Sequence, residues 1–158
     1  MSLKMMNDIE KIVEIAEREF KAQGVPKTNK RINLFALLLL AKKAVSAYEL
    51  VDSYHQMFEQ PVPVITVYRV LEFLQSKGLV HKLETANKYV ACSHIDCKQE
   101  HPASQFLICN NCLQVKELSI SERKFDELKL AIEDAGFHLD RPQLEMNCIC
   151  NVCYTAAQ

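Results

Sequence analysis

The chain of 158 residues has no hydrophobic run that approaches the roughly 20 apolar residues of a membrane-spanning helix. Its longest such run, residues 34–41, has the length of one buried helix. No signal peptide is visible, so we expect a cytoplasmic protein. Internal repeats and low-complexity tracts are also missing, and 49% apolar residues are enough to form one or two small globular domains.

A strong excess of charge of either sign is also missing, because the net charge is only −1. This balance hides a local imbalance. Six cations and no acidic residue lie between positions 21 and 48, namely Lys21, Lys27, Lys30, Arg31, Lys42 and Lys43. A local basic patch can contact DNA phosphates even in a neutral chain, although a charged run can equally be a solvated face.

Signatures of common enzymes are absent too. The sequence has no G-x-S-x-G, Walker or H-E-x-x-H pattern, and no H-x-E element of the zinc deaminases. We therefore expect a protein that is not an enzyme.

The first half has the pattern of four helices followed by a hairpin. Helices begin near Asn7, at the cap Thr28, at the Ser46–Glu49 capping box and after Pro63. The fourth has an apolar stripe, with Thr66, Arg69 and Glu72 off it and Tyr68 at its flank. Strands over 79–84 and 88–92 complete the order of a winged helix-turn-helix, so we expect a DNA-binding domain over residues 1–92.

The second half reads as a small α/β domain behind a polar hinge at residues 93–104. We expect strands over 105–109 and 115–118, a helix over 122–135, and further strands over 137–139 and 144–147. The helix would turn Phe125, Leu128, Ile132 and Ala135 inward. Residues 105–158 are too few to bury much core, so the domain needs a metal, a second copy of itself, or both. The fold class is therefore α+β.

The strongest motif is a pair of C-x-x-C sequences, formed by Cys109, Cys112, Cys150 and Cys153. Each C-x-x-C turn brings two thiolates to one Zn²⁺, and two turns complete a closed tetrahedron. Four thiolates leave no open position for water, which favours a structural zinc over a catalytic one. Cys148 offers a different partner for Cys150, but the spacing favours Cys150 with Cys153. Two alternative interpretations of these cysteines are a redox-active pair and unrelated buried cysteines.

A second group of potential ligands surrounds the hinge, namely His81, Cys92, His94, Cys97, His101 and Glu117. Taken singly, each has an ordinary structural explanation. His81 and Cys92 fall on adjacent strands of the wing, however, while His101 and Glu117 flank the first strands of the second domain. A metal held by these four would bridge the two domains.

Several motifs together resemble the ferric uptake regulator family, and most closely its zinc uptake regulator branch. The resemblance covers nearly the whole chain and rests on the following motifs: Thr28-x-x-Arg31, Ser46-Ala47-Tyr48, Thr66-Val67-Tyr68-Arg69 with Leu71 and Leu74, Gly78-Leu79-Val80-His81-Lys82, Tyr89-Val90-x-Cys92, and Phe106-x-x-Cys109-x-x-Cys112-x-x-Val115-x-Glu117.

The resemblance implies a role for each matching residue. Residues implied to face DNA are Arg31, Tyr48, Thr66, Tyr68 and Arg69, and an Arg at position 69 can donate two hydrogen bonds to a guanine edge. The paired cysteines match the structural zinc site, and His81, Cys92, His101 and Glu117 match a regulatory zinc site. Filling the regulatory site would orient the winged helices of a homodimer on an AT-rich palindromic operator and repress zinc-uptake genes.

The ligand chemistry of the regulatory set agrees with zinc. One thiolate, two imidazoles and a carboxylate suit a tetrahedral, borderline-soft ion. The chain departs from its relatives in having two extra thiols, Cys97 and Cys148, near the proposed sites. It also lacks the Gly-Leu-Cys sequence before the second cysteine pair. His94 is an alternative to His101 as a ligand. Two other functions stay open: a family member that senses another metal or peroxide, and a zinc-stabilised interaction or buffering module that does not bind DNA.

Overall fold

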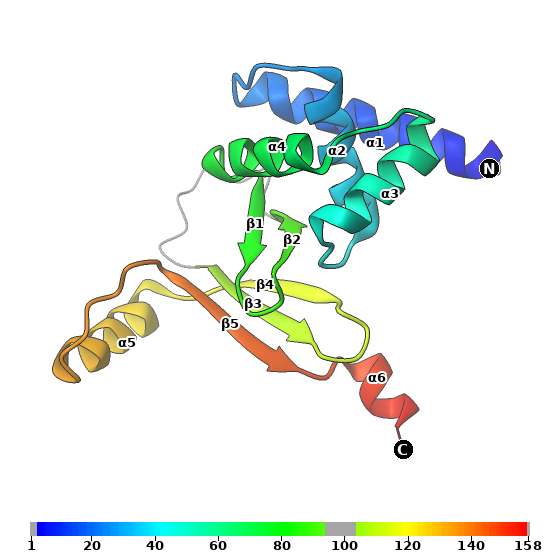
Figure 1. The fold of residues 1–158 in the computed structure, drawn as a ribbon. Helices are drawn as coiled ribbons and strands as arrows, with labels where there is room; N and C mark the ends of the chain where they lie inside the picture. Colours follow the sequence, from blue (N-terminus) through cyan, green and yellow to red (C-terminus); the bar gives the residue numbers. More distant parts are fainter. Residues whose placement is uncertain (1–2, 94–103, 158) are drawn as a thin grey trace. The chain divides into compact units, whose positions relative to one another are not determined.

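The computed structural model describes residues 3–93 and 104–157, which fall into two compact units, Met1–Ile95 and Asp96–Gln158. We describe each unit by itself (Figure 1). The first holds four helices and a two-stranded hairpin, and the second holds a three-stranded sheet and two helices. Within the described ranges, no helix is both long and apolar enough to span a membrane.

The helices of the first unit are α1 (Leu3–Ala22), α2 (Asn29–Ala41), α3 (Ala47–Phe58) and α4 (Val64–Ser76). Helix α1 begins four residues before the predicted start at Asn7. The Leu-Lys-Met-Met sequence at 3–6 consists of strong helix formers, so the helix extends past the cap pattern.

The predicted caps of α2 and α3 are present. Thr28 Oγ1 accepts a hydrogen bond from the backbone N–H of Arg31 at 3.3 Å. Ser46 and Glu49 form a complete capping box, in which each side chain accepts from the other residue's backbone N–H, at 3.2 and 2.7 Å. Both caps satisfy N–H groups that a helix N-terminus otherwise leaves unpaired.

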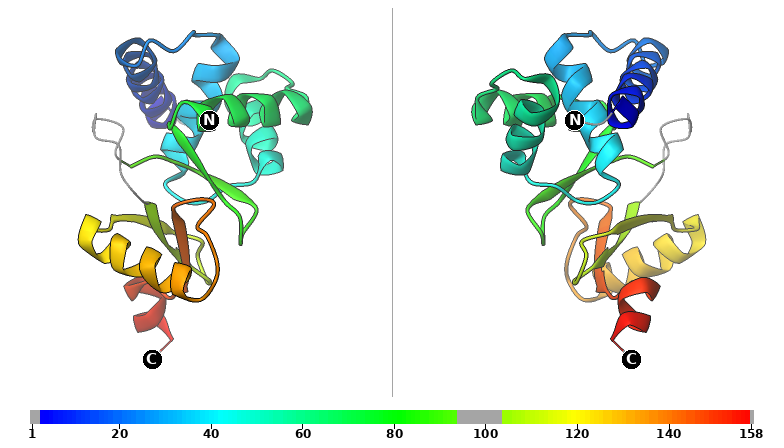
Figure 2. Two further views of the ribbon diagram at one scale, coloured as in Figure 1. Left: turned by 90° about the vertical axis from the view of Figure 1, so that its left-hand side faces the viewer. Right: turned by 90° about the vertical axis from the view of Figure 1, so that its right-hand side faces the viewer.

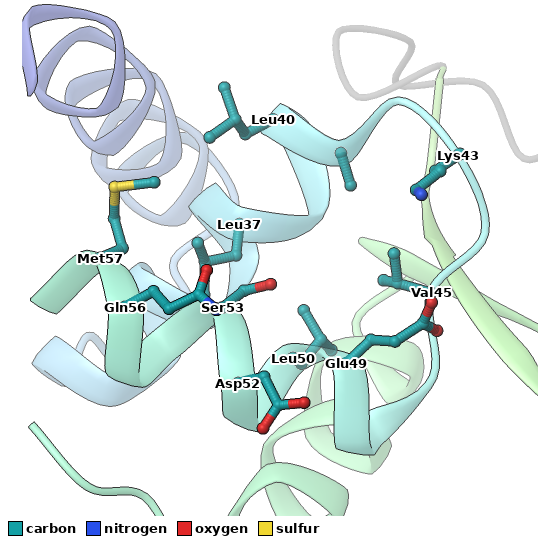
Figure 3. Close-up of a pocket in the computed structure, with 11 residues that line it drawn as sticks. Leu37, Leu40, Lys43, Val45, Glu49, Leu50, Asp52, Ser53, Gln56 and Met57 are labelled. Atoms are coloured by element: carbon teal, nitrogen blue, oxygen red, sulfur yellow. The ribbon is translucent and has the colours of Figure 1, made fainter. Parts of the chain in front are cut away.

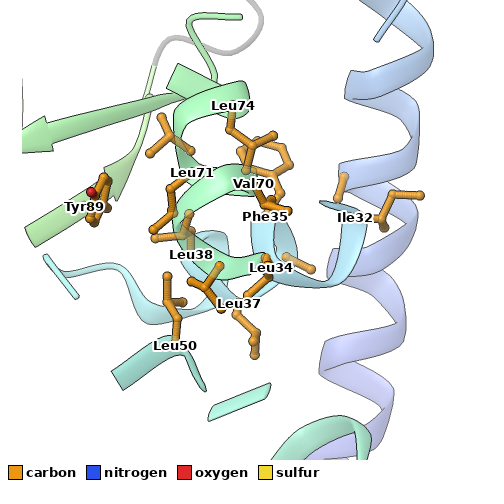
Figure 4. Packing of buried hydrophobic residues seen from close by; sticks show 14 of the residues in the cluster. Ile32, Leu34, Phe35, Leu37, Leu38, Leu50, Val70, Leu71, Leu74 and Tyr89 are labelled. Atoms are coloured by element: carbon orange, nitrogen blue, oxygen red, sulfur yellow. The ribbon is translucent and has the colours of Figure 1, made fainter. Parts of the chain in front are cut away.

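The core of the first unit is formed where α1, α2, α3 and α4 meet (Figure 4). Phe35, Leu38 and Leu71 are fully or almost fully buried there, and Phe20 of α1 packs against Phe35 with ring centroids 5.8 Å apart. Figure 4 shows the labelled side chains of α2 and α4 converging between the helices. The apolar stripe of α4 packs in this core, and the opposite face of α4 points away from it.

The wing consists of β1 (Val80–Leu83), β2 (Lys88–Ala91) and the turn between them. The strands are antiparallel, and His81 is paired with Val90. Helix α4 ends at Ser76, and the chain turns from it into the wing at Gly78, which has a φ of 69°. This left-handed conformation suits glycine, and it lets the N–H of Leu79 bond back to Leu74 and close the helix.

The second unit is built on a sheet of order β4-β3-β5, with β3 (Ser104–Cys109), β4 (Val115–Ser119) and β5 (Gln143–Cys148). Strand β4 runs antiparallel and β5 parallel to the central β3. Helix α5 (Glu122–Asp134) follows β4, and the unpredicted helix α6 (Asn151–Ala156) follows β5. The two helices lie at opposite ends of the sheet in Figure 1, and Figure 2 shows the same elements from two further sides.

The predicted strand over 137–139 is not formed. The N–H of Phe137 is bonded to Ile132 and the N–H of Gly136 to Glu133, so these residues close the C-terminus of α5 instead. The expected inward face of α5 is only partly correct. Phe125, Leu128 and Ile132 are half-buried, but Ala135 is exposed because it already stands at the helix C-cap.

Candidate metal centre and nucleic-acid interface

The four cysteines of the two C-x-x-C motifs come together at one end of the sheet in the second unit. Cys109 is the last residue of β3, and Cys112 lies in the turn that leads to β4. Cys150 is the N-cap of α6, and Cys153 lies within that helix. The parallel pairing of β3 with β5 aligns Cys109 with Cys148, so the two turns leave the sheet side by side.

The thiols have the geometry of a tetrahedral metal site. All four Sγ atoms lie within 4.8 Å of one another, and the Sγ atoms of Cys112 and Cys150 are 3.7 Å apart. Ligands at the Zn–S distance of 2.3 Å would place sulfur atoms about 3.8 Å apart at the corners of a tetrahedron. These residues could hold one zinc ion without rearrangement of the backbone.

Backbone hydrogen bonds favour the thiolate form of Cys109. The N–H groups of Cys112 and Cys150 lower the pKa of Cys109 to about 6, and the Cys150 N–H lies 3.4 Å from its Sγ. The neighbouring thiols of Cys150 and Cys112 raise the pKa of Cys153 to about 12. Four neighbouring thiolates repel one another, so a bound cation would supply the positive charge that keeps them deprotonated together.

The backbone of the two cysteine turns has a conformation that the C-x-x-C spacing does not predict. Leu113 closes the first turn with a φ of 60°, and its N–H bonds to the carbonyl of Cys109 at 3.0 Å. Helix α6 forms the second turn and carries Cys153 on its first turn. Cys148 is outside the group of four, because it is still part of β5.

The predicted regulatory ligands are distributed over both units. In the first unit, His81 and Cys92 are neighbours, with a ring nitrogen of His81 and the Sγ of Cys92 within 4.8 Å. The N–H of Cys92 bonds to Leu79 at 2.9 Å, which fixes the chain after β2 beside β1. In the second unit, Glu117 lies on β4 and accepts a hydrogen bond from Ser104 Oγ at 3.2 Å. His101, together with His94 and Cys97, is outside the described residues.

The outer face of α4 carries three of the residues predicted to contact DNA, namely Thr66, Tyr68 and Arg69. Arg69 is exposed, whereas Thr66 and Tyr68 are half-buried at its borders. Tyr48, at the start of α3, is 65% exposed. The three α4 residues face away from the core because the buried side of that helix is formed by Val67, Val70, Leu71 and Leu74.

Arg31 makes contacts within the protein that the sequence did not predict. Its guanidinium carbon lies 3.6 Å from the ring centroid of Phe73 on α4, and its Nη1 donates to the carbonyl of Pro26 at 3.0 Å. An Arg stacked on an aromatic face is held by cation–π attraction. Arg31 therefore links the start of α2 to the outer side of α4.

A pocket of about 610 Å³ lies between α2 and α3 and is lined by Leu37, Leu50 and Met57, with Lys43, Glu49 and Asp52 among its polar residues (Figure 3). None of the predicted metal ligands or DNA-facing residues lines it.

Known proteins similar to this chain match most of its length. A model of the ferric uptake regulator family matches residues 22–147. The zinc uptake regulation protein of Escherichia coli (strain K12) is 35% identical over 138 residues, which cover 87% of this chain and 78% of that protein. The solved structure of a zinc uptake regulator complexed with zinc and DNA matches with a TM-score of 0.77 and 31% identity, covering 94% of this chain and 97% of that one. The crystal structure of holo XcZur matches with a TM-score of 0.72 and 34% identity, covering 90% and 96%.

Proposed function

The chain belongs to the ferric uptake regulator family, and we propose that it is a zinc-responsive transcriptional repressor that binds DNA as a homodimer and controls zinc-uptake genes. One observation carries this proposal. The similarity to a zinc uptake regulator complexed with zinc and DNA extends over 94% of the chain, so it takes in most of both units. A repressor of chromosomal genes acts in the cytoplasm.

The structural zinc is held by Cys109, Cys112, Cys150 and Cys153. Support comes from the mutual approach of their thiols within 4.8 Å and from the N–H groups that bond to Cys109 Sγ. A further argument is the small core of the second unit, where Phe106, Ile108 and Cys109 are the buried apolar residues within the described part. A unit with so little buried surface depends on its metal for stability.

The regulatory zinc is held by His81, Cys92, His101 and Glu117. The neighbouring positions of His81 and Cys92 on the wing support this assignment, and so does the presence of both soft and borderline donors in the set. Occupation of this site orients the winged helices for operator binding. His94 and Cys97 are the alternative ligands to test.

The DNA contacts are made by α4 and by the N-terminal ends of α2 and α3. Arg69 reads a base edge in the major groove, and Tyr48, Thr66, Tyr68 and Arg31 contact the duplex around it. The operator is an AT-rich palindrome. Its palindromic form follows from the dimer, because a two-fold symmetric dimer presents two equivalent recognition helices, and its AT-richness is what the family resemblance implies. The half-buried apolar side of α5 and the thin core favour a second copy as the partner of the second unit.

Zinc analysis combined with an operator titration tests this function. We expect about two zinc ions per subunit, with DNA affinity rising as the second site fills. The titration needs a stated salt concentration, since phosphate contacts make affinity strongly salt-dependent. An affinity that responds to iron or manganese but not to zinc would point to another member of the family. Failure to bind any AT-rich palindrome at low salt would point to a zinc-stabilised interaction or buffering protein.

A further inference from the structure

The wing that carries His81 is joined to the start of α3 by two contacts outside the sites described above. The first is a β-bridge between Val45 and Tyr89, in which each N–H donates to the other residue's carbonyl, at 2.9 and 2.7 Å. Val45 thus extends the wing by one residue on the free side of β2. The next residue, Ser46, is the N-cap of α3.

The second contact is an ion pair between Lys88 of β2 and Glu49 in the first turn of α3. Lys88 Nζ lies 2.6 Å from Glu49 Oε2, and the same oxygen accepts the N–H of Ser46 at 2.7 Å. Figure 3 shows Glu49 beside Val45 at the edge of the pocket. Glu49 Oε2 therefore connects Lys88 of the wing with the N-cap residue Ser46 of α3.

The ion pair is shielded from solvent on its lysine side, while the Glu49 side chain is 44% exposed. The Lys88 side chain is only 19% exposed, so solvent and salt screen its charge less than at an open surface. Hydrogen bonds from Lys88 and Ser46 lower the pKa of Glu49 to about 2, which keeps the carboxylate charged at any physiological pH.

The ion pair also lies between two functional elements. On the wing, Lys88 is two residues from Val90, the strand partner of His81, and four residues from Cys92. On α3, Glu49 directly follows the exposed Tyr48. A change in the wing at its metal ligands would therefore reach the N-terminus of α3 through a short, mostly hydrogen-bonded connection.

We infer that the Lys88–Glu49 ion pair is a positioning contact that transmits the orientation of the zinc-binding wing to α3 and its DNA-facing Tyr48. The inference rests on the proposed function. It assigns to Lys88 and Glu49 a role in the zinc response without contact to zinc or to DNA.

A direct phosphate contact by Lys88 is the competing explanation, and the signs of the two charges separate them. If only electrostatic attraction to DNA mattered, Lys88→Met would weaken binding and Glu49→Gln would strengthen it. If the ion pair positions α3, both substitutions weaken binding of the zinc-loaded protein. Glu49→Gln suits this test because Gln can still complete the capping box.

The experiment measures affinity for an AT-rich palindromic duplex, selected from a random pool by the wild-type protein, at fixed salt, with one and with two zinc ions per subunit. The variants are Lys88→Met, Glu49→Gln, their double mutant and Lys88→Arg. Lys82→Met is the matched control, because Lys82 is a cation of the same wing whose ion pair, with Glu84 at 3.2 Å, stays within the wing. Thermal unfolding and zinc content establish that each variant is folded and loaded.

We expect each single substitution to reduce the affinity of the zinc-loaded form about threefold to tenfold, with little change in the one-zinc form. The double mutant should lose no more than either single mutant, and Lys88→Arg should retain most of the affinity. Lys82→Met should alter both zinc states equally. Opposite effects of Lys88→Met and Glu49→Gln, or additive losses, would overturn the inference and leave the proposed function intact. A wild-type protein without zinc-dependent DNA binding would overturn both.

Discussion

At the scale of single residues, the described cysteines differ in their surroundings. Cys92 is buried beside an imidazole on the wing, whereas Cys109, Cys112, Cys150 and Cys153 form a compact group of thiols. Because the two environments belong to different units, loss of a thiol should have different consequences in each.

We predict that Cys112→Ser and Cys92→Ser give distinct phenotypes. Cys112→Ser removes one of four thiolates from the structural site, so the second unit should lose its zinc and the protein should become unfolded or monomeric. Cys92→Ser should leave a folded dimer with about one zinc per subunit and weaker zinc-dependent DNA binding. Metal analysis and sedimentation of both variants test the division, and identical behaviour would contradict it.

Arg69 is the residue for which a base contact is predicted, and its substitution gives a second test. Arg69→Ala should cost about 1–3 kcal/mol of binding free energy on the operator. Binding to unrelated DNA should weaken much less, because it depends on phosphate contacts. An equal loss on both DNAs would identify Arg69 as a phosphate ligand instead.

Glu49 provides a prediction on pH. Its pKa is about 2 in the folded protein and near 4.5 in an unfolded chain, so its ion pair stabilises the fold fully above about pH 4.5. This contribution is lost as the pH falls from about 4.5 to about 2. Wild type should therefore be more stable than Glu49→Gln at pH 6, and the difference should shrink over that acidic window.

Chemical denaturation of both proteins between pH 6 and 3 measures the difference in their free energies of unfolding. The comparison cancels zinc loss, because acid protonates the same thiols in both. A difference that does not vary with pH would contradict the assigned pKa.

At the scale of elements, the start of α2 is attached to α4 through Arg31 and Phe73. The guanidinium stacks on the ring at 3.6 Å and is also held by the Pro26 carbonyl. Arg31 can thus contribute to DNA binding in two ways, by contact with the duplex and by fixing the position of the recognition helix.

We predict that Arg31→Lys lowers the stability of the free protein, because Lys keeps the charge but lacks the flat guanidinium. A double-mutant cycle with Phe73→Leu should give a coupling free energy of about 0.5–1 kcal/mol in denaturation without DNA. Thr28, the cap of the same helix, serves as a control, since Thr28→Ala should be additive with Phe73→Leu. Absence of coupling would leave DNA contact as the role of Arg31.

At the scale of the whole molecule, the two units differ in how they are stabilised. The first buries a large cluster of apolar side chains from four helices, whereas few apolar residues are buried in the described part of the second. Apolar burial is the main favourable contribution to folding, so the second unit requires a stronger external contribution.

We predict that complete removal of zinc by a chelator unfolds the second unit while the first remains folded. Amide hydrogen exchange should show lost protection in residues 104–157 and retained protection in α2 and α4. The dimer should dissociate in the same experiment, and re-addition of zinc should restore it. Protection lost to the same extent in both units would show that the chain unfolds as one cooperative body.

The sequence by itself determined that the first unit has four helices and a wing, and it located the caps of α2 and α3, because helical periodicity, capping boxes and glycine stops are local signals. It also predicted that the two cysteine pairs form one metal site, since the C-x-x-C spacing holds two ligands within one turn. Tertiary structure decided that Cys148 stays in β5, that Gly136 and Phe137 close α5 in place of a strand over 137–139, and that Arg31 stacks on Phe73. It alone joined Lys88 to Glu49, which are 39 residues apart. The physical reason is that such contacts depend on how the elements pack, and no pattern within a single element specifies its distant partner.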